Sequence, residues 1–131
     1  VASAYAEDDD HPVKAAVEQA VTEAGWTPAP WYARLKVDAM PKLATPERMA
    51  AVGASVPALA DVGAERHEIA FADLGPAELV EWRLGMAQIG PFYGALTAAE
   101  RAAVSAAARQ RLGDDPPPLV RRIVVLTALV A

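Results

Sequence analysis

The sequence has no cysteine and only two histidines, His11 and His67, which lie far apart in the chain. It therefore has neither disulfide bonds nor thiolate ligands, and two histidines are too few for a histidine-based metal centre. The acidic run of residues 7–10 lacks a second cluster at loop spacing, so we interpret it as a helix cap and expect no metal site. The lack of disulfides fits a reducing compartment, and we expect a cytoplasmic protein.

Several other features are missing. No glycine-rich turn joins a strand to a helix, so we expect no nucleotide-binding loop and no cofactor-binding residue in this chain. None of the three serines lies in a G-x-S-x-G motif, and we expect His67 to be structural and His11 to be solvated. The longest apolar run has about half of the roughly 20 residues that a membrane helix needs. A net charge of −5 disfavours nucleic acid and anionic membranes. No catalytic residue can be named.

The first half of the chain is rich in helix signals. Residues 1–6 are interpreted as the end of a buried core strand. Asp8 to Asp10 then offer capping carboxylates, and apolar side chains at helical spacing predict a helix that ends at Gly25. Residues 26–32 combine prolines with aromatics, which predicts a packed loop. Thr45-Pro46-Glu47 starts a short helix, and a further helical turn or two is expected from residue 57 to residue 62.

The second half predicts a strand, a helical region and a final strand. Residues 65–74 alternate in character as strands do. Residues 75–113 are predicted to be helical, with a break at Gly90-Pro91 and a capping box at Thr97 and Glu100. Residues 119–130 are rich in β-branched side chains, and we expect a strand that is polar near its start and buried afterwards. Because so apolar a strand needs cover on both faces and both edges, we expect a central strand of a larger sheet.

Aromatic side chains gather in the loops and helices and avoid the strands. Such rings commonly line a concave binding pocket, although they also serve simply to anchor a thin, alanine-rich core. Arg83 and Arg34 lie near them in sequence and suggest partners for a substrate carboxylate, or else solvated helix residues. The residues that we expect to line such a binding pocket are Trp31, Tyr32, Trp82, Met86, Phe92 and Tyr93.

The order and spacing of several segments resemble the carboxyl-terminal half of actinobacterial-type class I S-adenosylmethionine-dependent methyltransferases. The resemblance implies an α/β fold, part of a Rossmann-like methyltransferase, with the last strands of the sheet and helical cap insertions. It likens residues 1–6 to the fifth strand, residues 59–63 to the helix end before the sixth strand, and residues 119–129 to the antiparallel seventh strand between them. The segments that carry the resemblance are residues 1–6, 10–24, 30–32, 59–64, 68–73, 78–83 and 119–129.

The resemblance implies S-adenosylmethionine as cofactor, held mostly by residues outside this chain. The chain would then shape the pocket for a small organic acceptor, position that acceptor rather than act as acid or base, and be inactive by itself. Its expected partner is the missing amino-terminal half or a second copy in a dimer. Two other hypotheses stay open: a stand-alone ligand-binding or interaction module that completes its sheet by dimerisation, and a secreted domain cut after Ala6.

Overall fold

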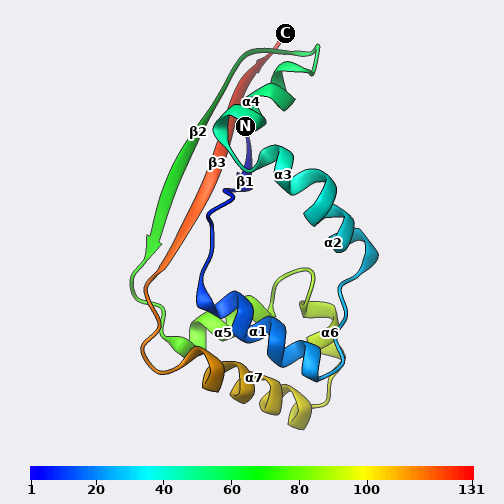
Figure 1. Ribbon diagram of the computed structural model, residues 1–131, viewed down its shortest axis with the longest axis vertical. Helices are drawn as coiled ribbons and strands as arrows, with labels where there is room; N and C mark the ends of the chain where they lie inside the picture. The colour runs from blue at the N-terminus through cyan, green and yellow to red at the C-terminus, as the bar shows by residue number, and fades with distance from the viewer. The chain divides into compact units, whose positions relative to one another are not determined.

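The computed structural model describes residues 1–131, which form two compact units. We call the first the sheet unit; it comprises Val1–Asp9, Pro30–Ala70 and Val120–Ala131. The second, the helical unit, comprises Asp10–Ala29 and Phe71–Leu119. Figure 1 shows the strands β1, β2 and β3 of the sheet unit and the helices α1, α5, α6 and α7 of the helical unit. The α/β class predicted from the sequence is confirmed.

The sheet has three strands in the order β1-β3-β2, where β1 is Ala2–Tyr5, β2 is Leu59–Phe71 and β3 is Leu119–Val130. β1 pairs antiparallel with β3, from Ala2 opposite Leu126 to Tyr5 opposite Ile123. The arrows of β2 and β3 in Figure 1 also run in opposite directions. The last strand of the chain therefore lies between the other two, and its predicted central position is confirmed.

The predicted burial of β3 is wrong at its end. Its first part is well covered, with Arg121, Val124 and Leu126 buried, whereas Leu129 is 61% and Val130 is 84% exposed. The apolar sequence of the last residues reflects strand propensity, since no other part of the chain covers them. Arg121, a polar residue near the start of β3, can be buried because it forms an ion pair with Asp9.

β2 corrects two boundaries. A helical turn was expected up to Gly63 and a strand only after it, but a single strand of 13 residues runs from Leu59 to Phe71. Gly63 is a strand residue, and a Cβ on it would lie 3.6 Å from the Thr127 hydroxyl of β3. Asp61, two residues earlier in the same strand, has a positive φ of 48°. Pairing with β3 thus overrides the local helix signals. The likeness of residues 59–63 to a helix end is accordingly wrong.

Helix α4 (Pro46–Ala54) covers part of the sheet and begins as predicted, with the Thr45 hydroxyl accepting from the Arg48 amide at 3.3 Å. Gly53 lets it approach closely, because a Cβ there would lie 2.7 Å from Leu126 Cδ1 and 2.8 Å from Val62 Cγ1. The buried residues of this small core are Ala6, Met49, Val124 and Leu126.

The expected packed loop is partly helical. Residues from Pro30 on form α2 (Pro30–Arg34), a π-helix (Leu35–Ala39) and α3 (Met40–Leu43), and none of their side chains is buried. Proline is favoured in the first helical turn, so Pro30 starts the segment that it was expected to break. Pro41 lacks the amide that an α-helix would bond to residue 37, which fits the change of helix type here.

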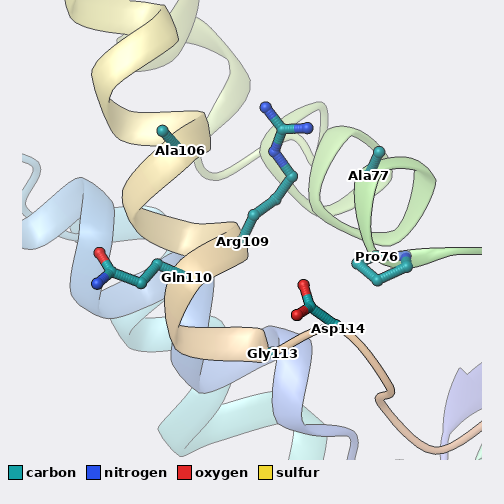
Figure 2. Close-up of a pocket in the computed structure, with 7 residues that line it drawn as sticks. All are labelled: Pro76, Ala77, Ala106, Arg109, Gln110, Gly113 and Asp114. Atoms are coloured by element: carbon teal, nitrogen blue, oxygen red, sulfur yellow. The ribbon is translucent and has the colours of Figure 1, made fainter.

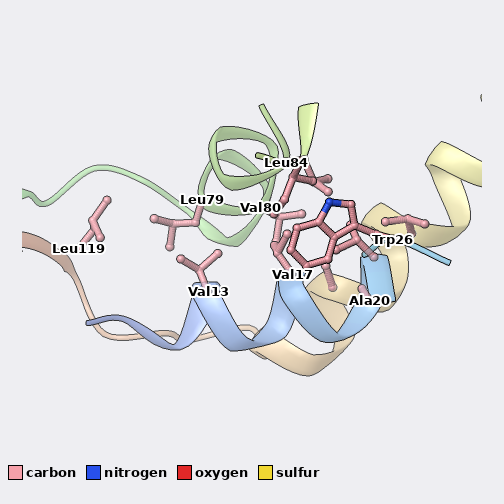
Figure 3. Close-up of a cluster of buried hydrophobic side chains, with 12 residues drawn as sticks. Val13, Val17, Ala20, Trp26, Leu79, Val80, Leu84 and Leu119 are labelled. Carbon is pink, nitrogen blue, oxygen red and sulfur yellow. The ribbon is translucent and has the colours of Figure 1, made fainter. Parts of the chain in front are cut away.

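The helical unit contains α1 (Pro12–Glu23), α5 (Pro76–Leu84), α6 (Gly90–Ala95) and α7 (Ala98–Leu112). α1, α5 and α7 pack against one another. Figure 3 shows the buried cluster between them, which includes Trp26. The indole N–H of Trp26 donates to the Gln88 carbonyl at 3.0 Å. The buried residues are Val13, Val17, Ala20, Val21, Trp26, Leu79, Val80, Leu84, Ile89, Val104, Ala108 and Leu119.

The helix ends agree with the sequence patterns in part. α7 has the predicted capping box of Thr97 and Glu100 and ends at Gly113, whose φ is 83°. α1 is capped by His11 instead of an aspartate: Nδ1 accepts from the Val13 amide at 3.1 Å, so Nε2 donates to the Pro117 carbonyl at 2.8 Å. His11 is only 5% exposed, so its predicted solvation is wrong. The Gly90-Pro91 break starts the short helix α6.

Candidate acceptor site

The structure divides the six predicted pocket residues between the two units. Trp31 and Tyr32 lie on α2 in the sheet unit. The other four belong to the helical unit, where Trp82, Phe92 and Tyr93 are half-buried and pack against its buried cluster. Met86 follows α5 and is also half-buried. The six residues therefore form two groups, one on α2 of the sheet unit and one in the helical unit.

The α2 group is an aromatic pair of an exposed Trp31 and a half-buried Tyr32. The Trp31 and Tyr32 rings meet edge to face, with centroids 5.6 Å apart and planes at 67°. The Lys36 ammonium lies 5.6 Å from the centre of the Tyr32 ring, within the range of a cation–π contact. Trp31 is 48% exposed, although a large aromatic side chain gains free energy by burial. This group offers aromatic surface and a positive charge to a ligand.

The helical-unit group contains a phenol held in its neutral form. Burial raises the pKa of Tyr93, the negative charge of Glu81 raises it further, and the positive charge of Arg101 offsets part of the effect. The Tyr93 hydroxyl donates to the Arg101 carbonyl at 3.4 Å. Glu81 in turn accepts from the Ser105 hydroxyl at 3.1 Å. Tyr93 can orient a ligand by a hydrogen bond but is a poor general base near pH 7.

Arg83 is the residue whose environment the sequence did not predict correctly. We expected either pairing with a substrate carboxylate, which stays a prediction, or a solvated side chain, which is wrong because the residue is buried on α5, at 7% exposure. Its Nε atom is buried without a hydrogen-bond partner. The sequence signal was its spacing, because Arg83 shares the helical face of Leu79, Val80 and Leu84.

A second buried arginine has a structural role in the sheet unit. Arg121 on β3 pairs with Asp9 at 2.8 Å, with side chains 8% and 2% exposed, and its guanidinium lies 4.0 Å from the centre of the Tyr5 ring. Asp9 also accepts from the Arg122 amide at 2.7 Å. Asp9 was expected to help cap the first helix; instead it ties the end of β1 to β3.

A surface hollow of about 430 Å³ lies in the helical unit between the start of α5 and the end of α7 (Figure 2). In that view the Arg109 side chain extends across the hollow toward α5, and the Asp114 carboxylate lies below it. None of the six predicted residues lines it. The lining residues are Pro76, Ala77, Ala106, Arg109, Gln110, Gly113 and Asp114.

The side chains do not assemble a metal centre: no three or more histidine, aspartate or glutamate residues come together as ligands. No helix combines the length and the apolar character that a membrane span requires. The sequence matches no protein-family model and no curated protein sequence.

Proposed function

We propose that the chain is the carboxyl-terminal, acceptor-binding half of a class I S-adenosylmethionine-dependent methyltransferase that acts on a small organic molecule. The observation that carries this proposal is the strand order β1-β3-β2, in which the last strand is antiparallel and lies between the other two. The resemblance implies this arrangement for the fifth, seventh and sixth strands of a Rossmann-like methyltransferase sheet. An insertion between two neighbouring strands by the last segment of the chain is a specific topological feature.

The free edge of β1 supports the proposal independently. β1 stands at one end of the strand order and pairs only with β3, so its other edge has no strand beside it. Tyr5 on this strand is 43% exposed, and Ile69 and Phe71 of β2 are 44% and 42% exposed. An unprotected edge and uncovered apolar side chains are what a sheet shows where further strands and helices belong.

The helices between β2 and β3 would provide the acceptor pocket. They carry Trp82, Met86, Phe92 and Tyr93, which all belong to the helical unit. S-adenosylmethionine supplies an electrophilic methyl group when it is bound by the other half. The residues of this chain would surround the acceptor, exclude water and hold the nucleophilic atom in line, which contributes to rate through positioning.

The coding sequence upstream of Val1 tests the proposal. We expect it to encode strands and helices that include a glycine-rich turn between a strand and a helix, the feature that binds the cofactor in such enzymes. A stop codon or a charged leader directly upstream would contradict the proposal.

The free edge of β1 also favours a second candidate, a stand-alone binding module that pairs two β1 edges in a dimer. Both candidates predict self-association of this chain alone. They differ for a chain extended by its upstream coding sequence: the methyltransferase would cover the edge and lose that association, whereas the module would keep it. Light scattering on the two lengths separates them.

A further inference from the structure

Arg83 lacks the counter-ion that a buried arginine requires. No carboxylate of the chain forms an ion pair with it, and its Nε atom is buried without a hydrogen-bond acceptor. The other buried arginine, Arg121, has the same 7% exposure but pairs with Asp9. Because a buried charge without a partner is strongly unfavourable, a group from outside the chain is the natural candidate to complete Arg83.

The position of Arg83 in the helix keeps most of its side chain out of water. With about 100° between successive residues of an α-helix, Arg83 falls between Leu79 and Val80 on the helix surface. Both neighbours are at most 1% exposed, and Leu84 beside them is fully buried. The side chain therefore leaves α5 on its apolar face, and its Nε atom is buried there; α5 packs against α1 and α7.

The acidic side chains nearest in sequence are engaged elsewhere. Glu81 accepts a hydrogen bond from the Ser105 hydroxyl at 3.1 Å. Glu78 turns back over Gly75 at the start of α5, where its Oε2 atom would lie 2.9 Å from a Cβ on that glycine. Neither carboxylate therefore neutralises Arg83, although both belong to the same helix.

We propose that Arg83 binds a carboxylate group of the methyl acceptor, which makes the acceptor a small aromatic or otherwise planar acid. This inference rests on the proposed function and narrows its substrate class. A guanidinium presents a rigid, planar fork that matches a carboxylate with two parallel hydrogen bonds. The same segment carries Trp82, Met86, Phe92 and Tyr93, which provide flat apolar surface for the rest of the molecule.

Nitrogen-15 NMR of the arginine Nε–H groups tests the proposal directly on the full 131-residue chain. The probes are benzoate and indole-3-acetate, each compared with its neutral amide, and Arg83→Lys assigns the Arg83 signal by removing it. We expect both acids to shift the Arg83 signal in a saturable way and the amides to leave it unchanged. The absence of a shift with both acids overturns the proposal.

Arg83→Met separates ligand binding from a structural role, and Arg109→Met is the matched control on exposed helix surface. We expect Arg83→Met to weaken benzoate binding by roughly tenfold or more, since hydrogen bonds between charged groups are lost. It should also raise the melting temperature of the free chain, because an unpaired buried charge is removed. The control should change neither quantity.

A variant Arg83→Met that melts at a lower temperature, or that keeps its benzoate affinity within about twofold, contradicts the proposal. Cofactor binding by the chain extended with its upstream sequence is measured separately. An extended chain that binds S-adenosylhomocysteine while Arg83 ignores both acids overturns the acceptor inference and leaves the proposed function standing. An extended chain that does not bind S-adenosylhomocysteine overturns the proposed function, and carboxylate binding at Arg83 is then judged from the NMR shifts alone.

Discussion

At the residue scale, the two buried arginines, Arg83 and Arg121, differ in their surroundings and therefore in the roles that we assign to them. Both are buried to the same extent, yet Arg121 has Asp9 and the Tyr5 ring beside it, whereas Arg83 has no carboxylate. The loss of one partner of a buried ion pair strongly destabilises the folded state, because the remaining charge is then buried without a counter-ion. The pair at Asp9 is thus a structural element, and the unpartnered Arg83 is a candidate for binding.

Asp9→Asn should strongly destabilise the sheet unit. The substitution leaves Arg121 buried beside a neutral amide, so we expect a loss of about 3 to 5 kcal/mol in the free energy of unfolding. Urea denaturation measures this loss, with the exposed Asp115→Asn as the control of equal charge change. Equal midpoints for the two variants would show that the pair contributes nothing.

The capping box of α7 should make stability depend on pH. Hydrogen bonds from the Thr97 hydroxyl and amide, each 2.7 Å, lower the pKa of Glu100 below its usual value of 4.5. Its contribution is therefore complete above pH 4.5 and is lost as the pH falls through the lower, folded pKa. We expect Glu100→Gln to be less stable than the wild type at pH 7, with the difference in the free energy of unfolding closing as the pH falls through the lowered pKa of Glu100; urea denaturation at a series of pH values measures it. A gap of constant size would contradict this account.

The same scale shows why capping was only half predictable. Five polar residues, Glu7 to His11, precede Pro12, and local signals identify a helix start among them without choosing the cap. The choice falls to His11 because Asp9 is engaged by Arg121, a residue close to the other end of the chain. Long-range pairs of this kind leave no local trace in the sequence.

At the element scale, local sequence patterns predicted elements correctly where the backbone hydrogen bonds are made within the element itself. α7 and α4 begin at the predicted caps, since the hydroxyl and the amide that it accepts from are three residues apart. β2 was mispredicted at residues 59–63 because its backbone bonds to β3, more than fifty residues later. Tertiary pairing then outweighs the helix propensity of alanine and leucine.

Gly53 tests the packing of α4 on the sheet. Gly53→Val adds a side chain where Leu126 and Val62 already lie within 2.8 Å of the new Cβ, so we expect overpacking to cost about 1 to 3 kcal/mol. Gly94→Val in α6 is the matched control, because nothing lies within 4 Å of a Cβ there. Its stability should change by less than about 0.5 kcal/mol. Thermal unfolding of both variants measures these changes. Equal losses of stability in the two variants would contradict the close approach of α4 to the sheet.

At the scale of the whole molecule, the central position of the last strand was predictable and its burial was not. An apolar strand needs neighbours on both edges, and β3 has them in β1 and β2. The exposed Leu129 and Val130 follow from the amount of chain available to cover the sheet, which sequence periodicity does not reveal. Of the six predicted pocket residues, four share one segment of the helical unit, as their spacing allowed.

We propose that this chain supplies the acceptor side of a methyltransferase whose cofactor is held by residues upstream of Val1. Calorimetric titration with S-adenosylhomocysteine tests it most directly, on the 131-residue chain and on the chain extended by its upstream coding sequence. We predict no measurable binding to the former and stoichiometric, saturable binding to the latter. Tight binding by the 131-residue chain alone, or none by the extended chain, would contradict the account.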